Sequence, residues 1–197
     1  MANPSELVQA LSPLVDEFNR LGIRYYVGGS VAGSIHGAAR STLDVDLAAE
    51  LDEAAGLRLI ALLQDDYYIN KEAMLDAVRH RSCFNLIHFA TSFKVDVFIS
   101  KGREFDRCVQ DRAVKETIGD AGSLAAPVAT AEDIILLKLE WYRLGNETSQ
   151  RQWNDLTLIA KLQGNRLDQE YLSQWANELG VADLLGSLML SVEPDAS

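Results

Sequence analysis

Two aspartates separated by one apolar residue, Asp44 and Asp46, stand in the segment LDVDLAAE at 43–50, which begins with the polar and apolar alternation of a β-strand. Side chains of a strand alternate between its two faces, so both carboxylates project to one side, with their Cα atoms about 7 Å apart. The segment FKVDVFIS at 93–100 has the same alternation and carries Asp96. If the two strands are neighbours, three carboxylates share one face.

Three carboxylates on one face need a counter-charge, because like charges repel and lose hydration when they are brought together. Hard divalent cations with oxygen ligands supply such a charge, and Mg²⁺ is held by a few carboxylates together with substrate phosphates. The pattern therefore predicts a site for a hard divalent cation such as Mg²⁺ on Asp44, Asp46 and Asp96. A solvated strand face is the alternative, since an isolated D-x-D triplet arises often by chance.

Two glycines and a serine, Gly28, Gly29 and Ser30, follow a short β-rich segment and precede the aspartates. A strand, a glycine turn and a helix start bring backbone N–H groups and the positive end of a helix dipole to one place, which attracts phosphate. These three residues are therefore candidates for nucleotide binding. The sequence does not match the Walker A or G-x-G-x-x-G patterns, and a simple turn is the alternative.

The elements that position these residues follow from hydrophobic spacing and capping signals. We expect a first helix from Pro4, capped by Asn3, to about Gly22. Strands are expected at 23–27, 43–50, 83–89 and 93–99, and further helices at 30–37, 52–64, 71–79 and 103–112. After the segment GDAG at 119–122 the pattern is strongly helical, with helices capped by Thr130, Ser149 and Asp168, and a short apolar stretch ends the chain.

These elements predict an α+β fold, a sheet flanked by helices with a C-terminal helical region behind it. We expect an αβ core over 1–128 and a helical region over 129–197, packed as one unit because no Pro/Gly/Ser-rich linker separates them. The N-terminus has no secretory pattern and no apolar run is long enough for a membrane span. The two cysteines lack the spacing of a metal site, and a cytoplasmic location is expected.

A net charge of −11 argues against an extended nucleic-acid surface, because phosphate binding depends on Lys and Arg. The charge is uneven, however: residues 71–115 hold nine basic and six acidic side chains, a balance of +3. This basic segment, with Arg79, Arg81 and Arg103 among its cations, is either a local patch for phosphate contacts or ordinary solvated surface.

The spacing of the glycine turn and the aspartates resembles a known fold. A hydrophobic strand, Gly29-Ser30, a gap of 13 residues, Asp44-Val45-Asp46-Leu47 and a later strand with Asp96 look like the nucleotidyltransferase fold. That fold is shared by DNA polymerase beta, the aminoglycoside nucleotidyltransferases and the minimal nucleotidyltransferases. The resemblance implies a mixed sheet and transfer of an NMP from an NTP to an acceptor.

Two motifs of the C-terminal half resemble those of one group within this fold. Lys138 in EDIILLKLEWYRLG and Asp155 in RQWNDLTLI resemble the third and fourth motifs of AbiEii-type toxin nucleotidyltransferases, a group that includes the mycobacterial MenT toxins. The resemblance covers roughly residues 23–160. Many relatives have a second acidic residue three positions after the aspartate of the fourth motif, where this chain has Leu158.

The resemblance also implies roles for the site residues. Two Mg²⁺ ions, or Mn²⁺ in their place, are implied. Asp44 and Asp46 would bind both ions, and Asp96 would bind the catalytic ion or act as the acceptor's base. Lys138 and Arg40 would add positive charge at the triphosphate, while Asp155 would orient Lys138 or the nucleoside. Their residue types alone leave alternatives: a loop arginine at position 40, a lysine that reaches solvent from an apolar helix, and a helix-surface charge at position 155, paired for example with Arg151.

Four functions remain compatible with these residues. The AbiEii-like motifs and the basic segment favour transfer to RNA, in particular to a tRNA 3′ end, by a type IV toxin-like enzyme that would have a cognate antitoxin. The net charge favours a small-molecule acceptor such as an aminoglycoside. Protein nucleotidylation and an inactive nucleotide-binding module are the other two.

Overall fold

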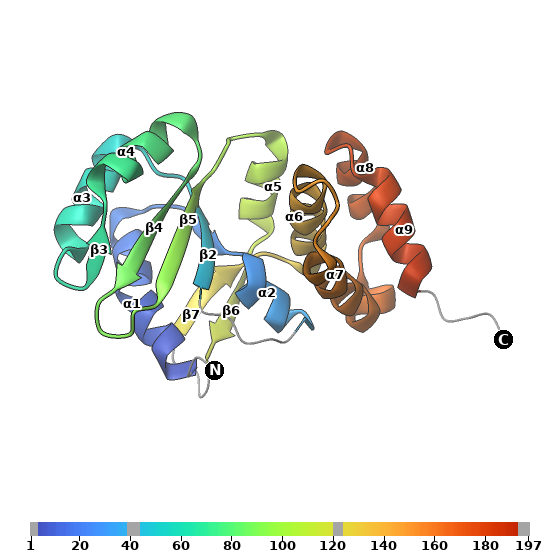
Figure 1. The fold of residues 1–197 in the computed structure, drawn as a ribbon, viewed down its shortest axis with the longest axis horizontal. Helices are drawn as coiled ribbons and strands as arrows, with labels where there is room; N and C mark the ends of the chain where they lie inside the picture. Colours follow the sequence, from blue (N-terminus) through green and yellow to red (C-terminus); the bar gives the residue numbers. More distant parts are fainter. Residues whose placement is uncertain (1–3, 39–43, 120–123, 193–197) are drawn as a thin grey trace. The chain divides into compact units, whose positions relative to one another are not determined.

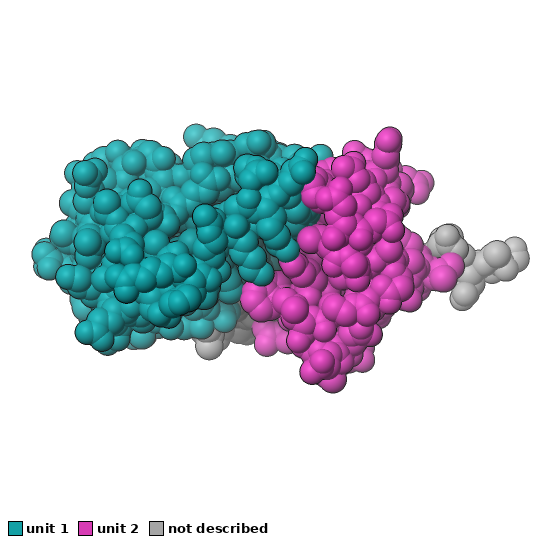
Figure 2. All heavy atoms as spheres, turned by 90° about the horizontal axis from the view of Figure 1, so that it is seen from above, with its two compact units in different colours: residues 1–31, 41–129 teal, residues 32–40, 130–197 magenta. Residues whose placement is uncertain are grey.

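The computed structural model describes residues 4–38, 44–119 and 124–192 (Figure 1). Contacts between residues divide the chain into unit 1, residues 1–31 and 41–129, and unit 2, residues 32–40 and 130–197 (Figure 2). The short helix α2 (Gly29–Ile35) begins in unit 1 and ends in unit 2. None of the helices in the described ranges combines the length and the apolar character that crossing a bilayer requires.

Unit 1 contains a mixed sheet, in which the strands of the described ranges follow the order β3-β4-β5-β2-β1-β7-β6. Strand β2 pairs in parallel with β5 and antiparallel with β1, and β1 pairs in parallel with β7. The mixed α+β architecture confirms the predicted fold class. The strands are β1 (Tyr25–Val27), β2 (Asp44–Ala49), β3 (Tyr67–Ile69), β4 (Cys83–His88), β5 (Lys94–Ile99), β6 (Val114–Ile118) and β7 (Leu124–Val128).

Helices cover one face of this sheet. Helices α1 (Pro4–Leu21) and α4 (Lys71–His80) contact the strands, and α3 (Glu53–Leu63) packs against both helices. The rings of Phe18 on α1 and Tyr25 on β1 lie 5.1 Å apart, and the hydroxyl of Tyr67 donates to the carbonyl of Ala10 over 2.7 Å. These contacts place the core of unit 1 between the sheet and its helices. Helix α5 (Glu104–Arg112) follows β5.

Unit 2 is helical beyond residue 130. Its elements are α6 (Ala131–Leu144), α7 (Gln150–Gln163), the short 3₁₀ helix η2 (Gly164–Arg166), α8 (Gln169–Glu178) and α9 (Ala182–Val192). The side chains of Thr130, Ser149 and Asp168 each accept a backbone N–H of the helix that follows, which confirms the three predicted caps. The core of the unit contains the buried side chains of Ile134, Leu139, Leu156, Ile159, Leu172 and Leu188.

Several predicted elements need correction. Residues 124–128 form β7, inside the predicted αβ core, although the pattern after residue 122 was expected to be helical; β3 and β6 were not expected. The apolar stretch near the end of the chain is helix α9. The cap expected at Asn3 lies outside the described residues. The prediction that the two halves pack as one unit stays a prediction.

Candidate active site

The predicted carboxylates lie on two adjacent strands of unit 1. Strands β2 and β5 run parallel, with Asp46 beside Asp96 and Asp44 beside Lys94 in the register. Paired residues of such a ladder project to the same side of the sheet, so Asp44, Asp46 and Asp96, the carboxylate cluster, share one face. The prediction that Asp96 joins the other two aspartates is confirmed.

The opposite face of the same strands is buried. On both strands a half-buried residue alternates with a fully buried one along the whole length. Each buried Val, Leu or Ile side chain contributes about 1.5–3 kcal/mol of burial free energy, so the core fixes the register that positions the carboxylates. The buried residues are Val45, Leu47 and Ala49 on β2 and Val95, Val97 and Ile99 on β5.

Lys94 places a positive charge against the carboxylate cluster. Its Nζ lies 2.6 Å from Oδ2 of Asp96. The hydrogen bond to Asp96, with the negative charges of Asp96, Asp44 and Asp46, raises the pKa of Lys94. The ammonium therefore stays charged at neutral pH and offsets part of the cluster's charge. Lys94 had no predicted role, although the spacing Lys-x-Asp on one strand placed both side chains on the same face.

The Gly28-Gly29 turn packs directly on Asp46. The backbone N–H of Gly28 donates to the carbonyl oxygen of Asp46 over 2.9 Å. Gly29 has a φ of +53°, and an ideal Cβ at this position would lie 1.7 Å from Oδ2 of Asp46. Only glycine therefore fits between the turn and the carboxylate. Ser30 follows and is buried; binding of phosphate by Gly28, Gly29 and Ser30 stays a prediction.

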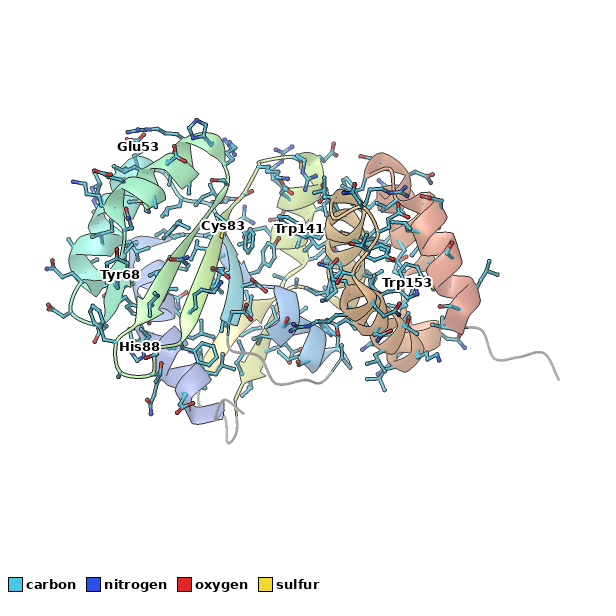
Figure 3. All side chains as sticks on the ribbon, viewed as in Figure 1. Glu53, Tyr68, Cys83, His88, Trp141 and Trp153 are labelled. Atoms are coloured by element: carbon cyan, nitrogen blue, oxygen red, sulfur yellow. The ribbon has the colours of Figure 1, made fainter. Side chains whose placement is uncertain are left out.

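Cys83 lies at the start of β4, beside the strand that carries Asp96 (Figure 3). It pairs with Phe98 of β5, and its thiol donates to the carbonyl of Phe84 over 3.5 Å. Cys83 is exposed, but partial desolvation of its sulfur, together with the negative charges of Asp96 and Asp46, raises the pKa of Cys83 to about 12. The thiol is therefore protonated at neutral pH, and Cys83 is not a nucleophile there.

Alkylation of Cys83 reports the charge of the carboxylate cluster. In a Cys108→Ser background, we expect slow reaction with iodoacetamide at about pH 8 and a rise in rate only as the pH approaches about 12. Asp96→Asn removes one of the charges and shifts this rise to lower pH. Mass spectrometry of the Cys83 peptide across a pH series measures the rate. A wild-type rise near the ordinary thiol pKa of about 8.5 would contradict the prediction.

Lys138 of α6 and Asp155 of α7 form a buried ion pair in unit 2. Nζ of Lys138 lies 2.9 Å from Oδ2 of Asp155, and the side chains are 13% and 8% exposed. Gly33 lies beside the pair, since a Cβ there would be 3.6 Å from Cε of Lys138. The contact agrees with one of the two roles considered for Asp155, orientation of Lys138, and the alternative of a lysine that reaches solvent is wrong. Leu158 is exposed on the same helix as Asp155.

Asp155→Ala leaves the ammonium of Lys138 largely buried without its carboxylate. We expect the free energy of unfolding to fall by roughly 2 kcal/mol, less than the 3–5 kcal/mol of a fully buried pair. The double variant Lys138→Met/Asp155→Leu removes both charges and should recover most of this loss. Urea unfolding measures both values. Equal stability of Asp155→Ala and wild type would show that the pair does not stabilise unit 2.

Three arginines of the basic segment 71–115 are engaged with groups of unit 1. The carboxylates beside two of them offset part of the positive charge, which weakens the case for an RNA-binding patch. Arg40, predicted to contact the triphosphate, lies outside the described residues. The contacts join Arg79 to Glu53 at 2.7 Å, Arg103 to Asp106 at 2.8 Å and Arg81 to the carbonyl of Ser100 at 2.8 Å.

The carboxylate oxygens of the cluster are ligands of the kind that a hard divalent cation such as Mg²⁺ binds. Asp46 and Asp96 are register partners, and the side chain of Asp46 occupies the space where a Cβ of residue 29 would lie. Within residues 4–38, 44–119 and 124–192, no three His, Cys, Asp or Glu side chains are gathered into a ready-made metal site. Metal binding through all three carboxylates thus requires local movement of side chains, and Lys94 would have to leave Asp96.

Sequence comparison finds no protein family and no curated protein that matches the chain. Solved structures do match. The solution structure of the antibiotic-resistance factor ANT(2'')-Ia has a TM-score of 0.59 at 12% identity, over 93% of this chain and 98% of that one. For the crystal structure of ANT(2'')-Ia in complex with adenylyl-2''-tobramycin, the TM-score is 0.56 at 11% identity, over 88% and 97% of the two chains.

An antigenic nucleotidyltransferase-like protein from Paracoccidioides brasiliensis is similar over a comparable length. Its TM-score is 0.55 at 17% identity, over 94% of this chain and 93% of that one. Similarity of this extent at such low identity concerns the arrangement of the elements rather than particular residues. The chain therefore has the nucleotidyltransferase fold.

Proposed function

We propose that this chain is a Mg²⁺-dependent nucleotidyltransferase, which moves an NMP from an NTP to an acceptor hydroxyl. The observation that carries the proposal is the parallel register of β2 and β5, which puts Asp44, Asp46 and Asp96 on one half-exposed face. The glycine turn packed on Asp46 and the nucleotidyltransferase fold support it.

The reaction forms a bond between the acceptor oxygen and the α-phosphorus and breaks the bond from that phosphorus to the oxygen that bridges it to the β-phosphate. Pyrophosphate and the acceptor's proton leave. Bound Mg²⁺ would supply positive charge to the phosphate and acceptor oxygens. Asp44 and Asp46 are the residues that would hold it. Asp96 would complete the ligand set or would accept the acceptor's proton on a carboxylate oxygen.

A cationic small molecule is the acceptor that the charges favour. The chain has a net charge of −11, and the arginines of the basic segment named above are already paired or hydrogen-bonded. A surface of this kind attracts a cationic acceptor and repels a polyanion. The likeness in fold to ANT(2'')-Ia, whose complex contains adenylyl-2''-tobramycin, is consistent with an aminoglycoside-like acceptor.

RNA, in particular a tRNA 3′ end, is the second candidate acceptor. The buried pair of Lys138 and Asp155 joins the two residues that resemble motifs of AbiEii-type toxins, and this observation favours a toxin-like enzyme with a cognate antitoxin. RNA binding by such an acidic chain would depend on a few phosphate contacts and would weaken steeply with salt. The predicted action of Lys138 on the triphosphate stays a prediction.

One labelling experiment separates the acceptors. The chain is incubated with Mg²⁺ and each of the four NTPs labelled at the α-phosphate, in the presence of aminoglycosides, total tRNA or lysate protein. We expect label on an aminoglycoside, with Asp44→Asn as the inactive control. Label on tRNA would favour the toxin-like enzyme, and label on protein would favour protein nucleotidylation. A chain that labels no acceptor with any NTP would contradict the proposed function.

A further inference from the structure

We propose that Lys94 is a resident counter-ion of the carboxylate cluster and competes with a divalent cation for Asp96. The inference rests on the proposed function, because it concerns the same three carboxylates. Because the lysine occupies Asp96, it sets the metal concentration at which Asp96 becomes available as a ligand.

The position of Lys94 is fixed by the strand register. Lys94 lies beside Asp44 across the ladder of β2 and β5 and two residues before Asp96 on its own strand. All three side chains therefore project from the same face. The 2.6 Å distance between Nζ of Lys94 and Oδ2 of Asp96 is that of a charge-assisted hydrogen bond. One ammonium thus contacts one carboxylate of the cluster and shares a face with the other two.

The two partners differ in their freedom to move. The side chain of Lys94 is 43% exposed, whereas that of Asp96 is 14% exposed. A lysine has a flexible four-carbon stem and a strongly hydrated ammonium, so it can turn into solvent with little loss of contact. Asp96 has a short side chain on a strand whose neighbouring residues Val95 and Val97 are fully buried. Separation of the pair therefore moves Lys94 and leaves Asp96 in place.

A divalent cation and the ammonium of Lys94 exclude each other at Asp96, because like charges at contact distance repel strongly. A cation held by Asp44 and Asp46 alone leaves the ion pair intact. A cation that also takes Asp96 as a ligand must displace Lys94. Removal of the lysine's charge should therefore tighten metal binding, and a substitution that keeps the charge should not.

The test is a titration of the full chain with Mn²⁺ alone, in which the EPR signal of free Mn²⁺ is followed. Mn²⁺ is the probe because carboxylates bind it as they bind Mg²⁺. We expect Lys94→Gln to bind Mn²⁺ at least about tenfold more tightly than wild type, because a charge in contact with the ligand set is removed. Lys94→Met repeats the measurement with an apolar side chain of similar length.

Two control variants test whether the effect depends on the charge and on the position of Lys94. Lys94→Arg retains the positive charge beside Asp96 and should bind Mn²⁺ within about threefold of wild type. Lys161→Gln removes an exposed lysine charge on α7 in unit 2 and should also match wild type. Thermal unfolding of each variant, with and without Mn²⁺, shows that the proteins compared are folded.

Asp46→Asn distinguishes the failure of this inference from the failure of the proposed function. If Asp46→Asn weakens Mn²⁺ binding but Lys94→Gln binds as Lys161→Gln does, the cluster binds metal without competition, and the inference alone is wrong. If Asp46→Asn binds Mn²⁺ as tightly as wild type, or if wild type and Lys94→Gln both fail to bind, there is no metal site at the cluster. Both proposals are then overturned.

Discussion

Asp46→Asn should lower kcat for nucleotidyl transfer by about 10³-fold while the chain keeps its fold. The amide keeps the size of the side chain beside Gly29 but loses the negative charge that would hold Mg²⁺. Because the carboxylates of the cluster repel one another, the loss of one charge should leave the melting temperature equal or slightly higher. The measurements are kcat with the acceptor identified by labelling, and thermal unfolding.

Asp65→Asn is the matched control for this substitution. Asp65 is exposed in the turn before β3, on the same unit, and its replacement removes the same charge away from the cluster. Its kcat should stay within about twofold of wild type. More than about a tenth of wild-type activity in Asp46→Asn, measured beside this control, would place the catalytic site elsewhere.

We expect Gly29→Ala to have the largest effect on stability, with a loss of about 2–5 kcal/mol in the free energy of unfolding. The left-handed backbone at φ +53° accounts for about 1–2 kcal/mol of this loss. The remainder, about 1–3 kcal/mol, comes from overpacking, because the added methyl collides with the side chain of Asp46. Chemical denaturation measures the loss, and transfer activity should be lost as well because Asp46 must shift.

Gly22→Ala separates these two contributions. Gly22 has a φ of +67°, but a Cβ there would meet no atom within 4 Å. Its substitution should therefore lower stability by only the backbone term of about 1–2 kcal/mol and leave transfer unchanged. If Gly29→Ala and Gly22→Ala lose the same free energy, the close contact between the turn and Asp46 does not exist in solution.

The strands that carry the carboxylates were predictable because their burial is one-sided. In β2 and β5 the core accepts every second residue, and this requirement leaves an alternation of polar and apolar residues in the first four positions of each strand. The helix caps at Thr130, Ser149 and Asp168 were predictable for a similar reason, since each is set by local hydrogen bonds. Features that depend on local hydrogen bonds, or on the regular spacing of buried residues within one element, can be predicted from a single sequence.

The missed strands have weak local signals. Strand β3 has three residues, and β7 has the sequence LAAPV, in which alanine and proline are poor strand formers. These segments are strands because other segments supply their hydrogen bonds: β3 pairs with β4, and β7 pairs antiparallel with β6 and in parallel with β1. Tertiary pairing of this kind leaves little trace in the segment itself.

Two contacts of the candidate site could likewise not be predicted from the sequence. The glycine turn indicated a phosphate loop, but its close approach to Asp46 joins positions far apart in the chain and follows from the pairing of β1 with β2. The ion pair of Lys94 with Asp96 depends on which way a long, flexible side chain turns on an exposed face. The spacing of the residues allowed that contact without requiring it.

The alternation of β2 and β5 divides their residues into two sets. The inward residues pack in the core, whereas Ala48 and Phe98 share the outward, half-buried face with the carboxylates. The surroundings of the carboxylates can therefore vary while the buried residues that fix the strand register stay the same.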